Sequence, residues 1–378
     1  MITELLGKSK EELHEYCVEL GEPAFRGAQI YHALYAERKF DVRQITNLPA
    51  ALRERLAKEA CVTLPEVKQR FASTDGSVRY LFGLSSGEEK LGRTASVEAV
   101  FMPSEGRQTI CISTQAGCAV DCHFCLTAQL GLIRNLTAGE ILAQVLLPLE
   151  EAHRGVQEKA DTGLKPSATK PGLAPQTNIV LMGQGEPLLN FEPVMAAVRI
   201  ILDPAGLGIS PKHVTLSTSG IVPGIERLAR EKVRPKLAIS LNASNDEQRD
   251  ALMPINKKYP LAALISTCKE YPLRTWEHLT FEYVMLGGLN DAGEDARRVV
   301  RLLAPLKSVK VNLIPWNPGE LPYRESSPER IEEFRRILVE RGVPAFVRYS
   351  RGRDVMAACG QLALLQIDGA PLSVVSPR

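Results

Sequence analysis

Gly117-Cys118-Ala119-Val120-Asp121-Cys122-His123-Phe124-Cys125 closely follows a short apolar segment, residues 109–113, and sets three of the eight cysteines of the chain in a C-x3-C-x2-C spacing. Thiolates this close in sequence can converge on one inorganic cluster. A four-iron cluster has one iron for each ligand and therefore needs four ligands. Three cysteines would leave one iron open, which predicts a site where a cluster meets a second molecule.

Strands and helices alternate on both sides of this stretch. Apolar segments predict strands at residues 109–113, 178–182, 213–217, 236–241, 280–286 and 309–314. Helical periodicity is found at residues 138–151, 194–202, 224–231, 261–270, 292–306 and 328–341. Such alternation is typical of parallel β/α units with right-handed crossovers. Six units predict an α/β fold with a partial (β/α)6 barrel over residues 107–350. Ligands of such folds bind at the C-terminal ends of the strands, and the cysteine stretch follows the first strand.

Two smaller parts precede the barrel. Residues 1–65 are expected to be helical, with a capping-box pattern at Ser9 and Glu12 before a helix to residue 20, and further helices at 25–35 and 48–60. Residues 66–106 show a period of two, with strands at 78–82 and 95–101 and turns at 74–77 and 85–87. This pattern predicts a small antiparallel linker. Helix–turn–helix arrangements occur in nucleic-acid-binding domains and also in plain helical bundles.

Residues 351–378 form the C-terminal segment, and we expect residues 368–378 to be loose. Residues 155–177 are rich in Pro, Gly, Ala, Lys and Thr without periodicity, which predicts a flexible surface insertion.

Composition restricts the class of protein and its surroundings. The chain has 378 residues and a net charge of +2, so overall charge says little about partners. Residues 297–353 hold 13 Lys and Arg against 6 Asp and Glu, which suits a polyanion such as RNA, although residues 330–341 could also be a solvated helix face. The N-terminus lacks the apolar core of a signal peptide, and no stretch is apolar enough to span a bilayer. We therefore expect a cytoplasmic protein without a membrane partner, whose cysteines serve metal binding or catalysis rather than a disulfide framework.

The cysteine stretch favours a cluster over zinc. Structural zinc sites take four protein ligands, and no second paired-cysteine motif or nearby His pair completes one, although His123 could ligate. Polar or glycine residues also lie at the C-terminal ends of the strands: Gly185, Glu186, Ser217, Ser240 and Asn242 (which flank Leu241), and Asn317. Each taken singly could be a turn or a helix cap. Together with the cysteine loop, they predict a pocket for a ligand with sugar, base and amino-acid parts.

These motifs resemble the radical S-adenosylmethionine (SAM) superfamily, in which a GGEP-like motif corresponds to Gly183-Gln184-Gly185-Glu186-Pro187. The match is narrower still. The chain resembles the dual-specificity ribosomal and transfer RNA adenine carbon-2 methyltransferases over nearly its whole length, on motifs at residues 115–118, 185–190, 216–220, 312–318 and 359–362. The resemblance implies one [4Fe-4S] cluster on Cys118, Cys122 and Cys125. It also implies SAM bound by Gly185, Glu186, Ser217, Ser240, Leu241, Asn242 and Asn317. Asn242 departs from the family, which often has His there, and this puts that contact in doubt.

The resemblance also gives roles to residues outside the cysteine loop. Cys359 corresponds to the methyl-carrying cysteine, Cys111 to the cysteine that resolves an RNA adduct, and Glu98 to the proton acceptor. Without the resemblance, Cys359 would be interpreted as a small buried residue and Glu98 as an exposed strand residue. Cys17, Cys61 and Cys268 match no motif and are expected to be structural.

The implied chemistry explains why two cysteines are needed. Carbon 2 of adenine is electron-poor and cannot attack the methyl group of SAM as a nucleophile. The resemblance implies that one SAM methylates Cys359 and that a second SAM is reductively cleaved to a 5′-deoxyadenosyl radical. Two SAM molecules are therefore used per turnover. That radical removes a hydrogen from the S-methyl group, and the methylene radical adds to adenine. Glu98 then takes the carbon-2 proton, and Cys111 attacks Cys359 to form a disulfide that releases the RNA.

The implied substrates are 23S rRNA at the peptidyl-transferase centre and tRNA at adenine 37, next to the anticodon. The adenine must leave its stack to be reached. We further expect a flavodoxin-like electron donor and a monomer. Two alternatives remain open: a carbon-8 adenine methyltransferase of 23S rRNA, which shares these motifs and confers antibiotic resistance, and a non-catalytic RNA-binding metalloprotein.

Overall fold

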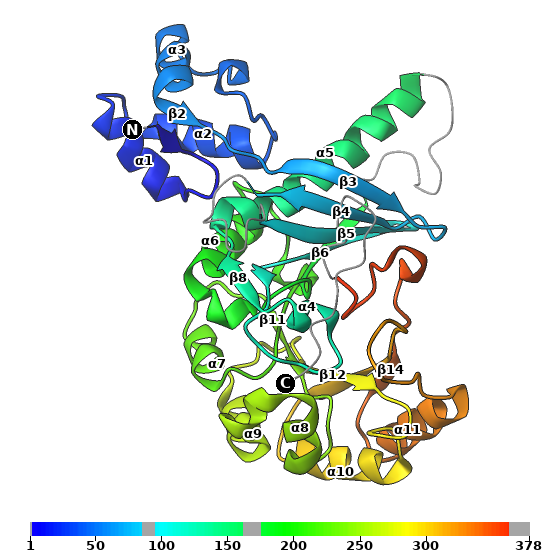
Figure 1. Cartoon of the computed structure of the whole chain (residues 1–378). Coiled ribbons are helices and arrows are strands. Elements are labelled where there is room, and N and C mark those ends of the chain that lie inside the picture. Colours follow the sequence, from blue (N-terminus) through cyan, green and yellow to red (C-terminus); the bar gives the residue numbers. More distant parts are fainter. Residues whose placement is uncertain (1, 85–94, 162–174, 363–378) are drawn as a thin grey trace.

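The fold is organised around one ten-stranded sheet with the strand order β14-β13-β12-β11-β10-β9-β6-β5-β4-β3 (Figure 1). The structure is a computed structural model that describes residues 2–84, 95–161 and 175–362. From β6 to β14 every neighbouring pair is parallel, and from β6 to β3 every pair is antiparallel. Within the described strands the order does not close on itself, so the parallel part is an open, partial barrel.

The six predicted parallel strands are confirmed. They are β6 (Arg107–Ile112), β9 (Gln176–Leu181), β10 (Val214–Thr218), β11 (Lys236–Ser240), β12 (Leu279–Met285) and β13 (Val309–Pro315). A seventh parallel strand, β14 (Ala345–Val347), follows the last helix at the edge of the sheet and was not predicted. It is only three residues long, too short to show a period of its own.

Alternation along each strand separates the two faces of the barrel. On β12, Phe281 and Tyr283 belong to the hydrophobic core beneath the helices, whereas Glu282 points to the barrel interior. On β6, Ile110 and Ile112 are core residues and Cys111 faces inward. Because side chains alternate with a period of two, the apolar residues cover the helix-facing side and the polar ones collect inside. The interior is therefore where a functional site can form.

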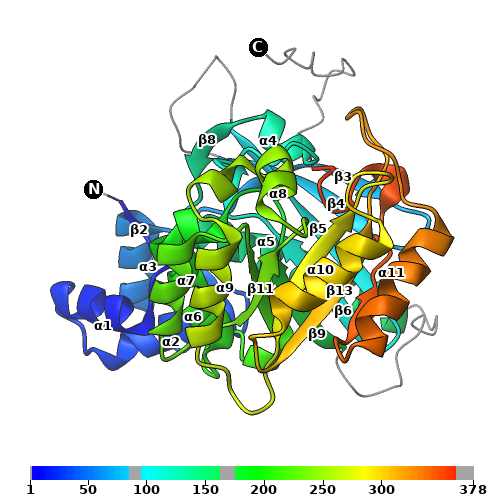
Figure 2. The same cartoon turned by 90° about the horizontal axis from the view of Figure 1, so that it is seen from below.

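Helices cover the outer face of the parallel strands (Figure 2). They are α5 (Ala138–Asp161), α6 (Phe191–Leu202), α7 (Val222–Ala229), α9 (Leu261–Glu270), α10 (Gly293–Leu303) and α11 (Pro328–Glu340). All six lie within or across the predicted helical segments. A further short helix, α8 (Asp246–Leu252), lies between β11 and α9 and was not predicted.

The predicted antiparallel linker is present as β3 (Glu66–Ala72), β4 (Val78–Gly83) and β5 (Ser96–Ser104). These strands extend the barrel sheet directly, because β5 pairs with β6 and Val100 lies opposite Cys111. The linker is thus a continuation of the barrel wall. The turn expected at residues 85–87 lies outside the described residues.

The N-terminal helices are α1 (Lys10–Glu19), α2 (Phe25–Tyr35) and α3 (Ala50–Glu59). The predicted capping box is confirmed: Ser9 accepts from the Glu12 backbone N–H at 3.1 Å, and Glu12 accepts from that of Ser9 at 2.6 Å. The helices contact the barrel through the Tyr31 hydroxyl, which donates to Asp203 at 2.9 Å. Two short strands, β1 (Thr3–Glu4) and β2 (Ala60–Cys61), pair in parallel beside them.

The irregular insertion expected at residues 155–177 was placed wrongly at both of its ends. Residues 155–161 continue helix α5 and residues 176 and 177 begin β9, so the irregular insertion expected at 155–177 is shorter than its composition suggested. Low-periodicity sequence can extend a helix that is already nucleated, because propagation is easier than nucleation. The tail at residues 368–378 lies outside the described residues. In the part of the chain that the structure describes, no helix combines the length and apolar character needed to cross a membrane.

Candidate active site

The three cysteines of the opening stretch line one cavity of about 170 Å³ at the C-terminal ends of the barrel strands, here called the cysteine-loop cavity. The loop leaves β7 (Gln115–Gly117) and enters the short helix α4 (Leu126–Gln129), neither of which was predicted. Gly117 has a φ of +72°, and a Cβ there would lie 1.9 Å from the Gly131 carbonyl oxygen. The close pairing of β7 with β8 (Leu132–Asn135) therefore requires glycine at this position.

Burial makes the three thiols reluctant to ionise unless a cation is present. It raises the pKa of Cys118 to about 12 and also raises the pKa values of Cys122 and Cys125. Phe124 packs in an apolar cluster with Met253 and Trp316, against which Cys122 and Cys125 also pack. Metal binding deprotonates thiols in such settings, because a bound cation favours the thiolate form. In the part of the chain that the structure describes, no three His, Cys, Asp or Glu side chains converge closely enough to hold a single metal ion. The three cysteines instead line one cavity with an apolar wall, and these donors suit the larger iron–sulfur cluster, in which each thiolate binds a different iron.

The loop after β9 forms one wall of this cavity. Gly185 has a φ of +97°, and a Cβ there would approach the Gln115 Cβ to 2.5 Å. The Glu186 carboxylate accepts from the backbone N–H of Leu188 at 3.1 Å and from that of Ser219 at 2.6 Å. Burial raises the pKa of Glu186, and these hydrogen bonds oppose the rise. Glu186 therefore ties two strand ends together, while the glycine leaves backbone groups open to the cavity.

Four other predicted SAM contacts also line the cavity: Ser217, Ser240, Asn242 and Asn317. Asn242 has a φ of +55°, a conformation that Asn tolerates better than most residues, and its Oδ1 accepts from the Val284 N–H at 2.8 Å. Leu241 differs from these residues. Its side chain is fully buried in the hydrophobic core, its backbone N–H donates to the Glu282 carbonyl oxygen at 2.9 Å, and it is not among the residues that line the cavity.

Arg249, which sequence reasoning missed, holds these strand ends together through hydrogen bonds to their backbone carbonyl groups. Its buried guanidinium donates to the carbonyl oxygens of Ser219 at 2.6 Å, Ser240 at 3.1 Å and Leu241 at 3.1 Å. Desolvation lowers its pKa to about 10, and the neighbouring Cys122 opposes this change. A cation beneath the thiol loop holds the carbonyl groups in register and also favours thiolate in the loop.

Cys359 lies at the junction of the cysteine-loop cavity and a larger one. The Asn317 amide donates to the Cys359 carbonyl oxygen at 3.2 Å and to the Ser350 hydroxyl at 2.9 Å. The Leu126 N–H, directly after the cysteine loop, donates to the Gly360 carbonyl oxygen at 2.8 Å. Asn317 is thus committed to holding the Cys359 segment as well as lining the predicted SAM site.

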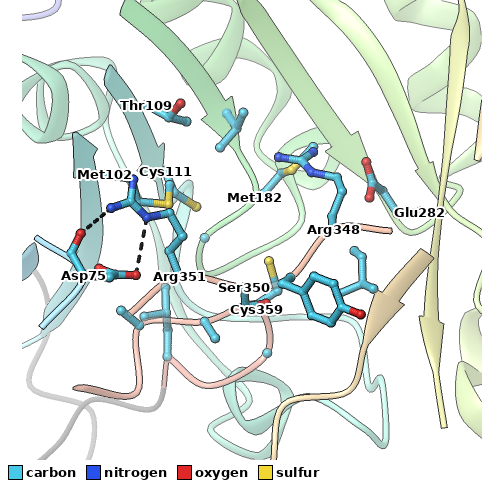
Figure 3. A pocket seen from close by; sticks show the side chains of 18 of the residues that line it. Asp75, Met102, Thr109, Cys111, Met182, Glu282, Arg348, Ser350, Arg351 and Cys359 are labelled. Atoms are coloured by element: carbon cyan, nitrogen blue, oxygen red, sulfur yellow. Dashed lines mark hydrogen bonds and ion pairs between the residues drawn. The ribbon is translucent and has the colours of Figure 1, made fainter. Parts of the chain in front are cut away.

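The larger cavity, here called the thiol cavity, has a volume of about 810 Å³ and holds both Cys111 and Cys359 (Figure 3). Burial raises the pKa of Cys111 to about 12, and the neighbouring Cys359 adds to the rise. Cys359 is an exposed residue, unlike the buried one that its sequence context favours, yet desolvation of its thiol raises its pKa, and Arg348 opposes the rise. All eight cysteines are free thiols in this structure, so the disulfide implied for Cys111 and Cys359 is not formed here.

Glu98 is fully buried, contrary to the exposed strand residue that its sequence context favours. Its Oε1 accepts from the Arg79 guanidinium at 2.7 Å, and Gln184 donates to its Oε2 at 3.5 Å. Ser113 and Gln184 also bond to its backbone. Glu98 is not among the residues that line either cavity. The structure therefore places it beside the site but in contact with protein groups.

Comparison with known proteins covers almost the whole chain. Residues 3–62 match the ribosomal RNA large subunit methyltransferase N-terminal domain, and residues 112–303 match the radical SAM superfamily. A probable dual-specificity RNA methyltransferase RlmN of Koribacter versatilis is 47% identical over 91% of this chain and 96% of its own length. The chain belongs to the RlmN family of radical SAM proteins.

Other comparisons agree with this family. The dual-specificity RNA methyltransferase RlmN of Anaeromyxobacter dehalogenans is 44% identical over 94% of this chain and 90% of its own length. The crystal structure of a radical SAM methyltransferase from Sphaerobacter thermophilus superposes with a TM-score of 0.81 at 40% identity, over 95% of this chain and 99% of that one. The α/β radical SAM fold and the expected class of enzyme, a SAM-dependent RNA methyltransferase, are thereby confirmed.

The basic segment at residues 297–353 is mostly paired with carboxylates. Arg335 and Arg336 on α11 bond to Glu332 and Glu340, as expected of a solvated helix face. Arg351 bonds to Asp75 near β3, and Arg353 pairs with Glu325 at 3.3 Å. Arg348 and Arg351 both line the thiol cavity, but among the described residues Arg348 has no carboxylate within ion-pair distance.

Sequence reasoning also assigned no role to two polar residues on the inner face of the barrel sheet. Glu282 and Asn312 sit on β12 and β13 amid apolar neighbours. A charged or amide residue on the inner face of a buried parallel strand is costly unless it is bonded or functional. That signal was present in the printed sequence and could have marked both residues.

Proposed function

We propose that this protein methylates carbon 2 of adenine in 23S rRNA, at the peptidyl-transferase centre, and in tRNA, at adenine 37 next to the anticodon. The observation that carries the proposal is the position of Cys359. Its thiol lines both the cysteine-loop cavity and the thiol cavity that holds Cys111. A carrier thiol between a radical-generating site and a substrate cavity is what transfer through a methylated cysteine requires.

Cys118, Cys122 and Cys125 would hold one [4Fe-4S] cluster, and SAM would bind beside it. The open backbone near Gly185, with Ser217, Ser240, Asn242, Asn317 and the backbone of Leu241, provides the polar groups for its amino-acid and sugar parts. Glu186 would act through the loop that it ties down. When bound, these cofactors supply one-electron cleavage of SAM and hydrogen abstraction, and two SAM molecules are used per turnover.

Cys359 carries the carbon, and Cys111 breaks the bond between them. Attack of the Cys111 thiolate on the Cys359 sulfur forms the S–S bond as the Cys359 S–C bond breaks, and the electron pair of the S–C bond stays on the methylene carbon. That carbon takes up a proton and becomes the methyl group of the released base, while the unpaired electron left by radical addition would return to the cluster. The disulfide is thus a product of turnover, and a reductant must reset it. Glu98 takes the carbon-2 proton in this proposal. Its carboxylate is held by Arg79 and Gln184, so it reaches the base only after those contacts rearrange.

We assign residues 1–65 to an RNA-binding helical domain, 66–106 to the antiparallel wall, 107–350 to the barrel and 351–378 to the segment that carries Cys359. The proposal also includes a cytoplasmic location, a monomeric state and a flavodoxin-like electron donor.

The test is anaerobic reconstitution followed by nucleoside analysis. With iron, sulfide, a reductant and SAM, we expect a cluster and 5′-deoxyadenosine, and with 23S rRNA or tRNA we expect 2-methyladenosine by mass spectrometry. Absence of cluster and of 5′-deoxyadenosine would leave only an RNA-binding metalloprotein. A product containing 8-methyladenosine and no 2-methyladenosine would contradict the assignment of the carbon atom.

A further inference from the structure

Two opposite charges face the thiol cavity without forming an ion pair. Glu282 on β12 and Arg348, just after β14, both line this cavity (Figure 3), and Glu282 lies where it joins the cysteine-loop cavity, which Glu282 lines as well. Of the described residues, none forms an ion pair within 4.0 Å with either side chain, although many other Arg residues of the chain are paired in this way. Opposite charges held apart across a cavity leave room for a polar molecule that satisfies both.

Glu282 is positioned with one oxygen committed and one available. The residue is only 5% exposed, and its Oε1 accepts from the Asn312 amide at 2.8 Å. Among the described residues no hydrogen bond reaches Oε2. Burial raises the pKa of Glu282, and Arg348 opposes that rise. Buried carboxylates are costly without partners, so an open acceptor here points to a ligand that donates.

Arg348 is fixed through its backbone rather than through its side chain. Its N–H donates to the Leu313 carbonyl oxygen at 2.8 Å, which continues the pairing of β14 with β13. Within the described part of the chain its guanidinium has no hydrogen bond, so its donors are available. It lines the same cavity as both thiols, and its charge opposes the burial-driven rise in the pKa values of Cys359 and Cys111. In Figure 3 it stands beside Glu282 on the side of the two cysteines.

We propose that Glu282 and Arg348 bind the Watson–Crick edge of the target adenine, with Glu282 accepting from the N6 amino group and Arg348 donating to N1. The proposal rests on the function proposed above and names how that site selects its base. Along this edge the atoms run N6, N1, C2, and Glu282, Arg348 and Cys359 line one cavity, where the view of Figure 3 draws the Arg348 guanidinium between the Glu282 carboxylate and the two cysteines. Carbon 2 therefore meets the carrier thiol once the two preceding atoms are bound.

The opposite edge of adenine offers the same order of groups, N6, N7 and C8. The same three residues would thus fit carbon 8 if the base were turned over. Recognition of N1 rather than N7 therefore determines that carbon 2, and not carbon 8, is methylated. Base analogues that lack N1 or N7 distinguish the two edges.

The experiment uses the reconstituted protein with Cys359 already methylated, and a tRNA anticodon stem-loop with one analogue at the target position. Transfer of the methyl carbon to RNA is measured in a single turnover. The analogues are purine riboside, which lacks the N6 amino group, 1-deazaadenosine and 7-deazaadenosine. We expect purine riboside and 1-deazaadenosine to react about ten- to one-hundred-fold more slowly than adenosine, since each loses a hydrogen bond to a charged group. We expect 7-deazaadenosine to react at nearly the rate of adenosine.

Variants then assign each contact. Glu282→Ala should slow methylation of the adenosine stem-loop and should remove the difference in rate between adenosine and purine riboside. Arg348→Met should remove the difference between adenosine and 1-deazaadenosine, which separates the contact from any intrinsic change in analogue reactivity. Glu340→Ala, on the exposed face of α11, is the matched control and should keep every preference. Methylation of Cys359 without RNA reports whether each variant is folded and binds its cofactors.

Three results would overturn the proposal. Equal rates with adenosine and purine riboside in the unaltered protein would remove the N6 contact. Slow methylation of the 7-deazaadenosine stem-loop, together with a normal rate for 1-deazaadenosine, would show that the protein binds the N7 edge of adenine. Loss of Cys359 methylation in Glu282→Ala, with base preferences retained in the residual activity, would assign Glu282 to SAM. Failure of the unaltered protein to methylate the adenosine stem-loop at all would instead count against the proposed function.

Discussion

At the scale of residues, Cys111 and Cys359 share a cavity, and the proposed function gives them different tasks. If Cys359 carries the carbon and Cys111 releases it, removal of each thiol stops the reaction at a different point. We expect Cys111→Ala to accumulate a covalent protein–RNA adduct that migrates slowly in denaturing gels. Cys359→Ala should form no adduct, because it has no sulfur to methylate. Cys61→Ala, a partly exposed thiol near the N-terminal helices, serves as control and should turn over normally. Normal turnover by Cys111→Ala would refute its assignment.

The buried state of Cys111 also predicts a pH dependence. Burial raises its pKa to about 12, so near neutral pH nearly all of this group is the unreactive thiol. The thiolate fraction grows with pH below the pKa. Release of RNA from the adduct should therefore accelerate about tenfold per pH unit between about pH 7 and 9. Rapid-quench measurement of adduct decay tests this, and a plateau beginning near pH 7 would show that the thiol is activated.

Gly185 tests the predicted SAM wall. Its φ of +97° disfavours any side chain, and a Cβ would lie 2.5 Å from the Gln115 Cβ. We expect Gly185→Ala to weaken SAM binding about tenfold or more, since left-handed strain costs about 1–2 kcal/mol before the clash is added. Gly342→Ala has a similar φ of +81° with no atom within 4 Å, so it separates backbone strain from loss of the site. Equilibrium dialysis with labelled SAM measures the affinity of both variants. Equal SAM affinities for Gly185→Ala and Gly342→Ala would contradict the assignment of Gly185 to the SAM site.

At the scale of elements, the segment that carries Cys359 is anchored at two ends. One end binds the cysteine loop and the end of β13. The other end binds the turn between β3 and β4: Asp75 accepts from the Gly352 N–H at 2.9 Å, and Asp354 accepts from the Thr74 N–H at 2.9 Å. The thiol is thus held between two elements that are far apart in sequence.

Asp75 should make this anchoring sensitive to acid. Burial opposes ionisation of Asp75, but hydrogen bonds from Ser77 and Gly352 outweigh it and hold its pKa well below the usual range. A lowered pKa stabilises docking above the ordinary aspartate value of about 3.9, and this stabilisation is lost as the pH falls further. We expect Asp75→Asn to speed amide exchange in residues 351–362 about threefold to tenfold at pH 7.

Hydrogen-exchange mass spectrometry checks this expectation, with Asp41→Asn as control. Asp41 caps a single helical turn at residues 42–44 in the N-terminal part, so replacing it with Asn should leave the amide exchange rates of residues 351–362 unchanged. Unchanged protection in Asp75→Asn would show that the anchor at the cysteine loop suffices.

Local patterns predicted most elements because their signals are local. The capping box at Ser9, helix α2 and six parallel strands follow from caps and periodicity. Strands β7, β8 and β14 are three or four residues long, and their pairing is decided by distant partners. Short elements of this kind carry no periodicity, so no local rule could have found them.

At the scale of the whole molecule, the barrel separates an apolar helix-facing side from a polar interior. The cysteine spacing predicts that Cys118, Cys122 and Cys125 hold a cluster, and in the structure all three line one cavity. The environment of Glu98 could not be predicted, because its contacts with Arg79 and Gln184 join residues 19 and 86 positions away. The commitment of Asn317 to the Cys359 carbonyl oxygen likewise depends on tertiary structure.

The central claim is that the methyl carbon reaches RNA through Cys359 after losing one hydrogen. The most direct measurement gives the reconstituted protein SAM with a trideuterated methyl group and determines the mass and identity of the methylated nucleoside. Transfer through a methylene on Cys359 predicts 2-methyladenosine that retains two of the three deuterium atoms. A product that retains all three would show direct methyl transfer and would contradict the account.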